Sequence, residues 1–459
     1  MVARGVWEPR ITGEGGFVSA AHGIRAETAV PRSRPLPGQD IPDAVRLPFV
    51  TLVLVLLWNH IWFSDLASRS LLSDPEAGSV FTQALFVVLG TSMLAALGRL
   101  GLAKLRPLAS WPLLLLGGWL GVTTLLSTDP MLSIRRIVLF GIVALLAGGV
   151  LVVARNGRQF ATALALASGI VLAASYLGVA LVPGLTIHSA FDVTGEYNHI
   201  GLWRGIFTHK NEAGSAMSLI AVCGLYVAAV LHRGIGWTIT AAALVFMVFA
   251  GSKTPLAVLP LVLLVSVLCS RARSGAMRGL MLVGPVAVLI VATIGSVLLP
   301  PIRTVLDALI PDATFTARNE IWAFAIEHIV VHPIRGWGYG AFWLTDRTVY
   351  GGGADPGSDW VQTATQAHNS FLDAALIMGV PGALLLLNAL VVAPIRDLQR
   401  TSAGRPLDSQ TLLFLRIWML AVISASFENV LLNANTVLCG MTMLAVFGLR
   451  LRTAYRPAA

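Results

Sequence analysis

The chain has 459 residues, of which 56% are hydrophobic and 12% are charged, and its mean hydropathy is +0.77. Soluble domains carry about 25% charged residues, so this composition excludes an ordinary soluble protein and predicts one that crosses a membrane many times. The formal net charge of +9 would suit a nucleic-acid-binding protein. However, the basic residues cluster in short connections between apolar segments, so membrane topology explains the charge and we expect no nucleic-acid partner.

Residues 1–46 open the chain with a segment rich in Arg, Gly and Pro. This segment has no apolar core of the length that a signal peptide needs, so we predict a disordered tail and no cleavable signal. The three cysteines, Cys223, Cys269 and Cys439, all fall within apolar segments and show neither a disulfide framework nor metal-ligand spacing.

About twelve apolar segments follow the tail, each long enough to cross about 30 Å of hydrocarbon as a helix. None shows the period-2 alternation of membrane strands, so we predict an all-α polytopic membrane protein. Nine transmembrane helices are expected in residues 47–299, and three more, followed by a short cytoplasmic tail, in 371–459. The predicted spans lie near residues 47–64, 79–98, 110–127, 137–153, 160–183, 213–231, 236–250, 255–270, 279–299, 372–394, 411–428 and 431–449.

The distribution of Lys and Arg predicts the orientation of these helices. Most of the 32 basic residues lie in the two termini and in alternate connections, such as those that contain Arg155, Arg233 and Arg271. Because cytoplasmic loops carry the excess of Lys and Arg, we predict that both termini are cytoplasmic. We therefore expect the protein in a bacterial cytoplasmic (inner) membrane, with the remaining connections facing the periplasm or the cell exterior.

A polar interval of residues 300–370 separates the ninth and tenth predicted spans. Loops longer than about 15 residues in compact folds are usually functional or disordered. This one is rich in tryptophan and has a helical pattern, which argues against disorder. We therefore predict a large extracytoplasmic catalytic loop that contains short amphipathic helices.

The first candidate element is the stretch from Trp203 to Asn211, directly before a predicted span. Its functional residues would be Arg204, His209, Lys210 and Asn211, of which the first three are potential cations at the membrane surface. Gly205 would let the backbone approach a ligand closely. The alternative is interfacial anchoring by Trp and basic residues, with Asn211 capping the next helix.

The second candidate element is the short outward turn Gly251-Ser252-Lys253-Thr254-Pro255. An ionisable residue below the headgroup level is costly, so Lys253 either snorkels to the interface or points into a cavity shared with Arg204.

The third candidate element runs from Arg318 to His332, with apolar residues at helical spacing and Pro333 as its stop. Arg318 and Trp322 are four residues apart, so they share a helix face. The alternative to a functional Arg318 is a structural lid in which it pairs with an acid. The glycines of Gly336-Trp-Gly-Tyr-Gly340 follow no strand, so we interpret them as a tight turn and not as a nucleotide-binding loop.

The fourth candidate element is Ala367-His368-Asn369-Ser370, directly before a predicted span. A histidine near neutral pH can exchange protons, although a single loop histidine is more often inert. Asn369 or Ser370 would cap the following helix. Glu428, which ends a predicted span on the same side, could pair with one of the cations or act as a second acid or base.

In this order, the four elements resemble the O-antigen ligase and exopolysaccharide polymerase superfamily, often called Wzy-type, and most closely its polymerases. The resemblance rests on the Trp203–Asn211 stretch, on Arg318 with Trp322, on Pro333 followed by two spaced glycines, and on His368-Asn369. Members often have Arg in the short turn where this chain has Lys253, and Lys cannot form Arg's bidentate fork.

The resemblance implies a membrane glycosyltransferase that moves a glycan from an undecaprenyl diphosphate carrier to a hydroxyl of a growing chain or of lipid A core. Ligases of this class are understood to be metal-independent, inverting enzymes, which implies no metal and no cofactor. The implied partners are the lipid-linked donor, the glycan or lipid A acceptor, membrane lipids and polysaccharide export or flippase machinery.

Within this resemblance, the catalytic residues would be His368 and Arg318. Cations would hold the diphosphate leaving group, and His368 would either accept the proton of the acceptor hydroxyl or hydrogen-bond the diphosphate. Trp322 and Trp337 could stack on sugar faces, or they could equally serve structural packing. The predicted substrate-binding residues are Arg204, His209, Lys210, Asn211, Lys253, Trp322, Asn369 and Glu428.

We interpret the chain as a glycan polymerase, with a ligase as the nearest alternative. A transporter of lipid-linked sugars is a third alternative, which would place ionisable residues at midplane in broken helices. Arg416 is the clearest charge within a predicted span, whereas the outward candidates are more numerous, so an enzyme is favoured.

Overall fold

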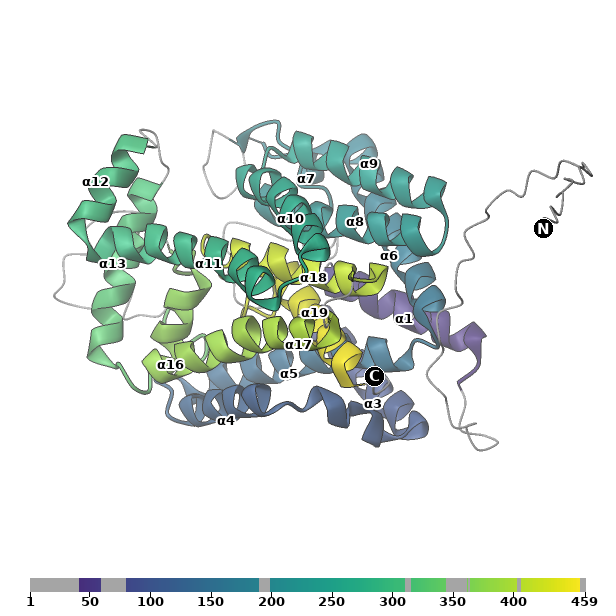
Figure 1. Ribbon diagram of the computed structural model, residues 1–459, viewed down its shortest axis with the longest axis horizontal. Helices are drawn as coiled ribbons and strands as arrows, with labels where there is room; N and C mark the ends of the chain where they lie inside the picture. Colours follow the sequence, from purple (N-terminus) through teal and green to yellow (C-terminus); the bar gives the residue numbers. More distant parts are fainter. Residues whose placement is uncertain are drawn as a thin grey trace, which may run out of the picture. The chain divides into compact units, whose positions relative to one another are not determined.

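The computed structural model describes residues 41–58, 80–189, 199–309, 315–343, 361, 364–402 and 406–454. Gln39–Ala459 form one compact unit, and the other unit, Met1–Gly38, lies outside the described residues together with most of the predicted tail. The described part is helical, and its one β-bridge joins Ile187 to Trp203. The predicted all-α polytopic membrane fold is therefore confirmed (Figure 1).

Each of the twelve predicted spans corresponds to a helix. In chain order these are α1 (Asp43–Trp58), α3 (Val80–Leu100), α4 (Trp111–Leu125), α5 (Pro130–Val153), α6 (Gly157–Leu181), α8 (Lys210–Val230), α9 (Arg233–Ala250), α10 (Lys253–Arg271), α11 (Gly275–Leu298), α16 (Ser370–Leu386), α18 (Ser409–Ser424) and α19 (Val437–Ala454). Within the described residues, nine helices are long and apolar enough to cross a membrane, or ten if the bent pair of η1 (Leu102–Leu108) and α4 is one span. α18 is apolar but shorter, so the count of twelve stays a prediction.

Two boundaries differ from the sequence prediction. α1 begins at Asp43, inside the predicted tail, because Asp43 accepts a hydrogen bond from Arg155 at 2.7 Å and a second from Gln159 at 3.0 Å. α18 ends at Ser424 and α19 begins at Val437, so Glu428 lies in a non-helical connection and does not end a span.

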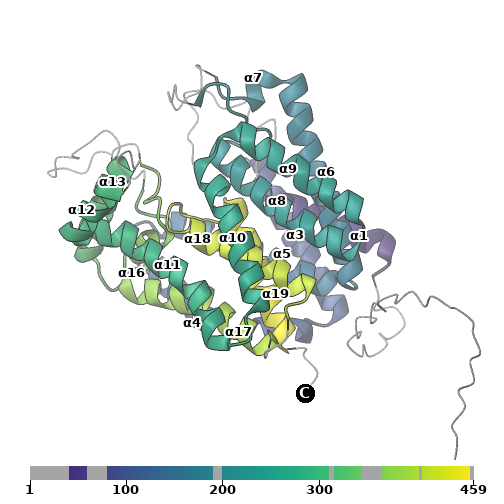
Figure 2. The ribbon, with the colours of Figure 1, turned by 45° about the horizontal axis from the view of Figure 1, so that its top comes forward.

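The centre of the compact unit is formed by α8, α18 and α19. α18 packs against α8, α10 and α19, and α19 also packs against α5 (Figure 2). The fully buried Trp418 of α18 donates its Nε1–H to Leu390 O at 2.7 Å, which ties α18 to the π-helical turn η3 (Leu387–Val392) that follows α16.

The long polar interval contains two helices, α12 (Pro300–Leu309) and α13 (Phe315–Val331). α13 ends before Pro333, as predicted, and packs against α16 and α11. The side chains of α13 and of the following turn form a second buried cluster with the N-terminal part of α16.

A break in α16 fixes the glycine turn of residues 336–340. Gly379 has φ of 71°, Val380 N donates to Pro333 O at 2.8 Å, and Pro381 has no N–H to donate. The carbonyls of Leu376 and Ile377 therefore accept from the backbone N–H groups of Trp337 at 2.9 Å and Gly338 at 3.1 Å. The segment is a tight turn, as expected, and it packs against α16, where its positive-φ glycines allow the close approach.

The contacts among the connections between helices show two groups, one at each end of the helices. At one end the chain segments around residues 128, 318, 337, 368 and 428 touch one another. At the other end, Arg450 binds Asp397 at 3.0 Å and Gln399 donates to Gly275 O at 3.1 Å. Which end faces the cytoplasm remains the prediction made from the Lys and Arg distribution.

Candidate active site

Three predicted residues meet at the first of these ends. Arg318, from the first turns of α13, donates from Nη2 to Glu428 Oε1 at 3.1 Å, and His368 Nδ1 lies 2.9 Å from Glu428 Oε2. The exposed fraction of the side chain is 25% for Arg318, 20% for Glu428 and 29% for His368. One carboxylate thus bridges an arginine and a histidine in a site that is largely withdrawn from solvent but still open to it.

His368 is held in an unusual backbone conformation. Its φ of 48° makes it the one non-glycine residue with positive φ in the described part of the chain. This region costs an ordinary residue roughly 1 kcal/mol or more, so the neighbours must hold it in place. They do so on both sides, since Ala367 O accepts from Trp322 Nε1 at 2.9 Å, and the Asn369 side chain accepts from Phe371 N at 3.0 Å and caps α16.

A second set of hydrogen bonds fixes the loop that carries Glu428. Ser370 Oγ donates to Glu428 O at 2.8 Å and accepts from Val430 N at 2.8 Å. Asn369, which is fully buried, donates from Nδ2 to Ser426 O at 3.2 Å. The residues next to His368 therefore also position its carboxylate partner.

Asp373 also holds the segment around His368 in place, through a hydrogen bond from Ala367. It is 2% exposed, accepts from Trp343 Nε1 at 2.7 Å, and accepts from Ala367 N at 3.1 Å. Sequence reasoning missed this residue, although an acid in the first turn of an apolar helix was a visible signal.

The charge on Glu428 determines which ring nitrogen of His368 carries a proton. Burial raises the pKa of Glu428, but the hydrogen bond and charge of His368 and the charge of Arg318 outweigh burial and hold this pKa below its ordinary value. Glu428 is therefore a carboxylate at neutral pH and can only accept. It follows that the His368 Nδ1 carries the proton, and that Nε2 of a neutral His368 has a free lone pair.

Three histidine rings lie beside this site. The ring centroids of His188, His199 and His209 are 5.1–5.7 Å apart. His209 Nδ1 accepts from Asn211 N at 3.2 Å, which caps α8, and His188 Nε2 accepts from Lys210 N at 3.2 Å. Within the described ranges no group of three His, Cys, Asp or Glu side chains has the geometry of a metal site.

His209 is not the cation that its position suggested. Burial, followed by the charges of His188, His199 and Lys210, lowers the pKa of His209 to about 4. The ring is neutral at pH 7, and its Nε2–H is a hydrogen-bond donor because Nδ1 accepts from the backbone. The charges of His209 and Glu428 influence one another's pKa, so the histidine cluster and the Arg318–Glu428–His368 site are neighbours.

The remaining residues of the Trp203–Asn211 stretch lie around this cluster. Arg204 is half-buried and donates from Nε to Leu185 O at 3.0 Å. Gly205 has φ of 61°, and a Cβ there would lie 2.8 Å from the Phe246 ring, so its close approach is to protein.

The turn that contains Lys253 joins the same region. Ser252 Oγ donates to Asn211 Oδ1 at 3.1 Å, and a Cβ on Gly251 would lie 2.9 Å from Leu202. Lys253 begins α10 and its side chain is exposed. Asn211 therefore binds this turn, while His209, and not Asn211, caps α8.

Trp322 and Asn369 have structural surroundings. Trp322 is fully buried and its indole N–H is used by Ala367 O, so its ring is enclosed by protein and is not placed to stack on a sugar. Asn369 is also fully buried. Both residues act on the site through the position of His368.

The family model described as O-Antigen ligase matches residues 238–387. This part of the chain is similar to the O-antigen ligase family. A search of curated proteins gave no match. The resemblance noted from the sequence is thereby confirmed.

The O-antigen ligase match covers Lys253, Arg318, Trp322, His368 and Asn369. Arg204–Asn211 and Glu428 lie outside it, although Glu428 binds both predicted catalytic residues. The match and the apolar helices support a multi-pass membrane protein, and the matched family implies a glycosyltransferase-like activity with a lipid-linked glycan and an acceptor as partners.

Proposed function

We propose that the protein polymerises undecaprenyl-diphosphate-linked oligosaccharide units into a surface or exported polysaccharide. The observation that carries this proposal is the contact of His368 and Arg318 with one carboxylate, Glu428. A base, its orienting acid and a cation for the leaving group are the groups that glycosyl transfer from a diphosphate needs.

In the proposed step, the acceptor hydroxyl oxygen bonds to the anomeric carbon while the bond from that carbon to the diphosphate oxygen breaks. The hydroxyl proton passes to His368 Nε2, and the diphosphate leaves with the bonding electron pair. Arg318 stabilises the charge that develops on it. Attack on the face opposite to the leaving group inverts the configuration at the anomeric carbon.

The hydrogen bonding of His368 favours a base over a diphosphate ligand. A group that binds a diphosphate must donate a proton, whereas the Nδ1–H of His368 is already taken by Glu428. In a neutral ring, Nε2 is then an acceptor that suits the proton of a sugar hydroxyl. A well-placed base of this kind raises the rate by about 10²–10⁴-fold.

Binding of the diphosphate is assigned to Arg318 together with the Trp203–Asn211 region. The Arg318 guanidinium uses one N–H on Glu428 and presents five in all. Arg204, Lys210 and Lys253 supply further positive charge on this end of the molecule, and neutral His209 supplies a donor. The extracytoplasmic orientation of this end and an inner-membrane location are part of the proposal.

The second candidate is ligation of a finished glycan to lipid A core or another acceptor. The description of the matching family favours it. The two functions use the same donor chemistry and differ in the acceptor.

Polysaccharide analysis of cells that carry variant genes tests both candidates. We expect His368→Ala and Arg318→Ala to abolish long polymer while the protein still reaches the membrane. Arg303→Ala is the matched control, because Arg303 lies on α12 of the same interval and is 59% exposed. Single repeat units left on the carrier would identify a polymerase, whereas long glycan left on the carrier would identify a ligase. Normal polymer length and yield in both active-site variants would contradict either function.

Thiol labelling tests the orientation. The three native cysteines are buried, so the background is low. A membrane-impermeant reagent added to intact spheroplasts should label Arg303→Cys and not Arg233→Cys. The opposite pattern would place the candidate site in the cytoplasm and end the proposal.

A further inference from the structure

The end of α13 and the residues that follow it form an exposed apolar patch, which we call the α13 tip. It consists of Val330, Val331 and Ile334, whose exposed fractions are 59–71%. The three residues lie close together in the chain, at the point where Pro333 stops the helix. A single exposed apolar residue is ordinary on a protein surface, but several large ones together mark a surface that contacts a partner or a membrane.

Hydrogen bonds place the α13 tip beside the ends of membrane helices. Pro333, within this segment, accepts at its carbonyl from Val380 N of α16 at 2.8 Å. Trp337, in the turn that follows, accepts at its carbonyl from Thr128 N at 3.1 Å, in the connection between α4 and α5. α5 begins two residues after Thr128 and is long and apolar enough to cross a membrane. The tip therefore lies at the level of a membrane surface.

The helix faces beside the α13 tip are also apolar and exposed. Val380 and, one turn further along α16, Leu384 are exposed. Leu125 and Leu126 are exposed at the end of α4, which packs against α16. Such faces contact lipid tails in a protein that crosses a membrane, so the tip continues a surface that faces lipid.

α12 has a second apolar face. The helix begins two residues after the end of α11, which is long and apolar enough to cross a membrane, and none of its residues is buried. In Figure 1, α12 and α13 run across the direction of α11 and not along it. The apolar side chains of α12 recur at helical spacing and share one face, which consists of Ile302, Val305, Leu306 and Leu309. An amphipathic helix in this position lies in the plane of the membrane surface.

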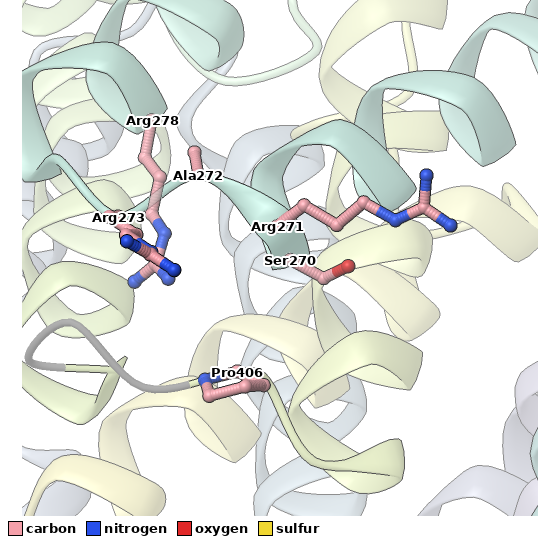
Figure 3. Close-up of a pocket in the computed structure, with 6 residues that line it drawn as sticks. All are labelled: Ser270, Arg271, Ala272, Arg273, Arg278 and Pro406. Carbon is pink, nitrogen blue, oxygen red and sulfur yellow. The ribbon is translucent and has the colours of Figure 1, made fainter.

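The opposite end of α11 shows what a connection in water exposes. There, where the chain arrives from α10, Arg271, Arg273 and Ser274 are exposed, and Figure 3 shows both arginine side chains extending from the backbone. The α13 tip exposes three apolar side chains instead, and the exposed Arg335 directly follows it. A guanidinium at the edge of an apolar patch can reach the phosphates of lipid headgroups.

We propose that the α13 tip and the apolar face of α12 insert into the lipid interface and anchor these two helices to the membrane. Such helices insert by about 5–10 Å, to the boundary between headgroups and tails. Arg318 lies near the other end of α13, so the anchor fixes one end of the helix whose first turns bind Glu428. The proposal concerns lipid contact alone, so its failure would leave the proposed glycosyl transfer untouched.

Fluorescence quenching by labelled lipids in proteoliposomes tests the proposal. The three native cysteines are buried, so one introduced cysteine can carry an environment-sensitive fluorophore on the full-length protein. The test variants are Val330→Cys and Leu309→Cys. The matched controls are Glu320→Cys, near the start of α13, and Arg303→Cys, on the polar side of α12. All four side chains are exposed, so the substitutions should not prevent folding.

We expect lipids that carry a nitroxide near the headgroup to quench the fluorophore at both test positions about twofold or more strongly than at the controls. Equal quenching at test and control positions would overturn the proposal, and so would stronger quenching at only one test position, since the anchor requires both. Blue-shifted emission from Val330→Cys without quenching would also overturn it, because protein, such as a second copy of the chain, would then cover the tip.

Discussion

Replacement of Glu428 by glutamine tests the proton arrangement at the candidate site. Glu428 makes two charge-assisted hydrogen bonds, to Arg318 and His368, each of a kind worth about 1.5–3 kcal/mol. Because the three side chains are 20–29% exposed, screening reduces this, and we expect Glu428→Gln to lower the free energy of unfolding by about 1–3 kcal/mol.

The effect on rate should be larger than the effect on stability. A glutamine can turn its NH₂ group toward His368 Nδ1, which moves the ring proton to Nε2 and removes the base. Loss of the orienting carboxylate costs about 10²–10⁴-fold in comparable His–carboxylate pairs. The assay is single-turnover release of undecaprenyl diphosphate from a lipid-linked repeat unit in proteoliposomes. The matched control is Glu327→Gln, an exposed acid of α13.

The lowered pKa of Glu428 adds a pH test of the same change. A carboxyl whose pKa is lowered in the folded state stabilises the fold fully above its unfolded pKa, near 4.5, and this contribution is lost as pH falls through the folded pKa. The stability difference between wild type and Glu428→Gln should therefore be full at pH 6 and shrink below pH 4.5. Wild-type turnover by Glu428→Gln, or a difference that persists undiminished at pH 3, would refute the reasoning.

Three further changes test the supports of the site. Ser370→Ala removes the hydroxyl that bonds Glu428 O and Val430 N, so it should lower the free energy of unfolding by about 1–3 kcal/mol and reduce turnover. The control Ser218→Ala loses only a hydrogen bond within its own helix and should leave turnover unchanged in the same assay. Trp322→Phe keeps a buried ring but leaves Ala367 O without its donor, so turnover should fall although no substrate contact is lost; unchanged turnover would show that Ala367 needs no such anchor. His209 has a pKa of about 4 in the folded state, so between pH 6.5 and 4 the unfolded state binds more protons than the folded state. The free energy of unfolding of the wild type should therefore fall by at most about 3 kcal/mol as the pH is lowered over that range. His209→Asn keeps a helix cap that does not titrate, so it should lose less stability in the same pH series of thermal unfolding.

The sequence predicted features that depend on neighbours along the chain. Apolar length located the long apolar helices that the structure describes, because a membrane leaves few alternatives to a helix that satisfies its own backbone. Apolar residues at helical spacing predicted the helix after Arg318, and Pro333 predicted its stop. The four-residue spacing of Arg318 and Trp322 predicted that they share a face. In the structure Arg318 binds Glu428, the hydrogen-bond partner of His368, and Trp322 binds the carbonyl of Ala367, the residue before His368.

Features that depend on distant residues were not predictable. Nothing near Glu428 in the sequence shows that it binds Arg318, 110 residues earlier, or His368, 60 residues earlier. The connection after α18 was missed because Val430, Leu431 and Leu432 extend the apolar pattern. Its backbone is satisfied by Ser370, whose role therefore could not be seen from periodicity.

The histidines show the same limit for electrostatics. His209 was expected to contribute charge because of its place beside Arg204 and Lys210. Its lowered pKa comes from burial and from His188 and His199, which only the fold brings to it. Residue type gave the chemistry available at this position, and packing decided which protonation state is present.

The affinity of the protein for undecaprenyl diphosphate tests the central claim most directly, because it asks whether a lipid diphosphate binds beside His368. Calorimetric titration should compare wild type with Arg318→Gln and with the exposed control Arg303→Gln. We predict that Arg318→Gln binds about tenfold or more weakly and that Arg303→Gln binds as the wild type does. Equal affinity in all three proteins would contradict the account.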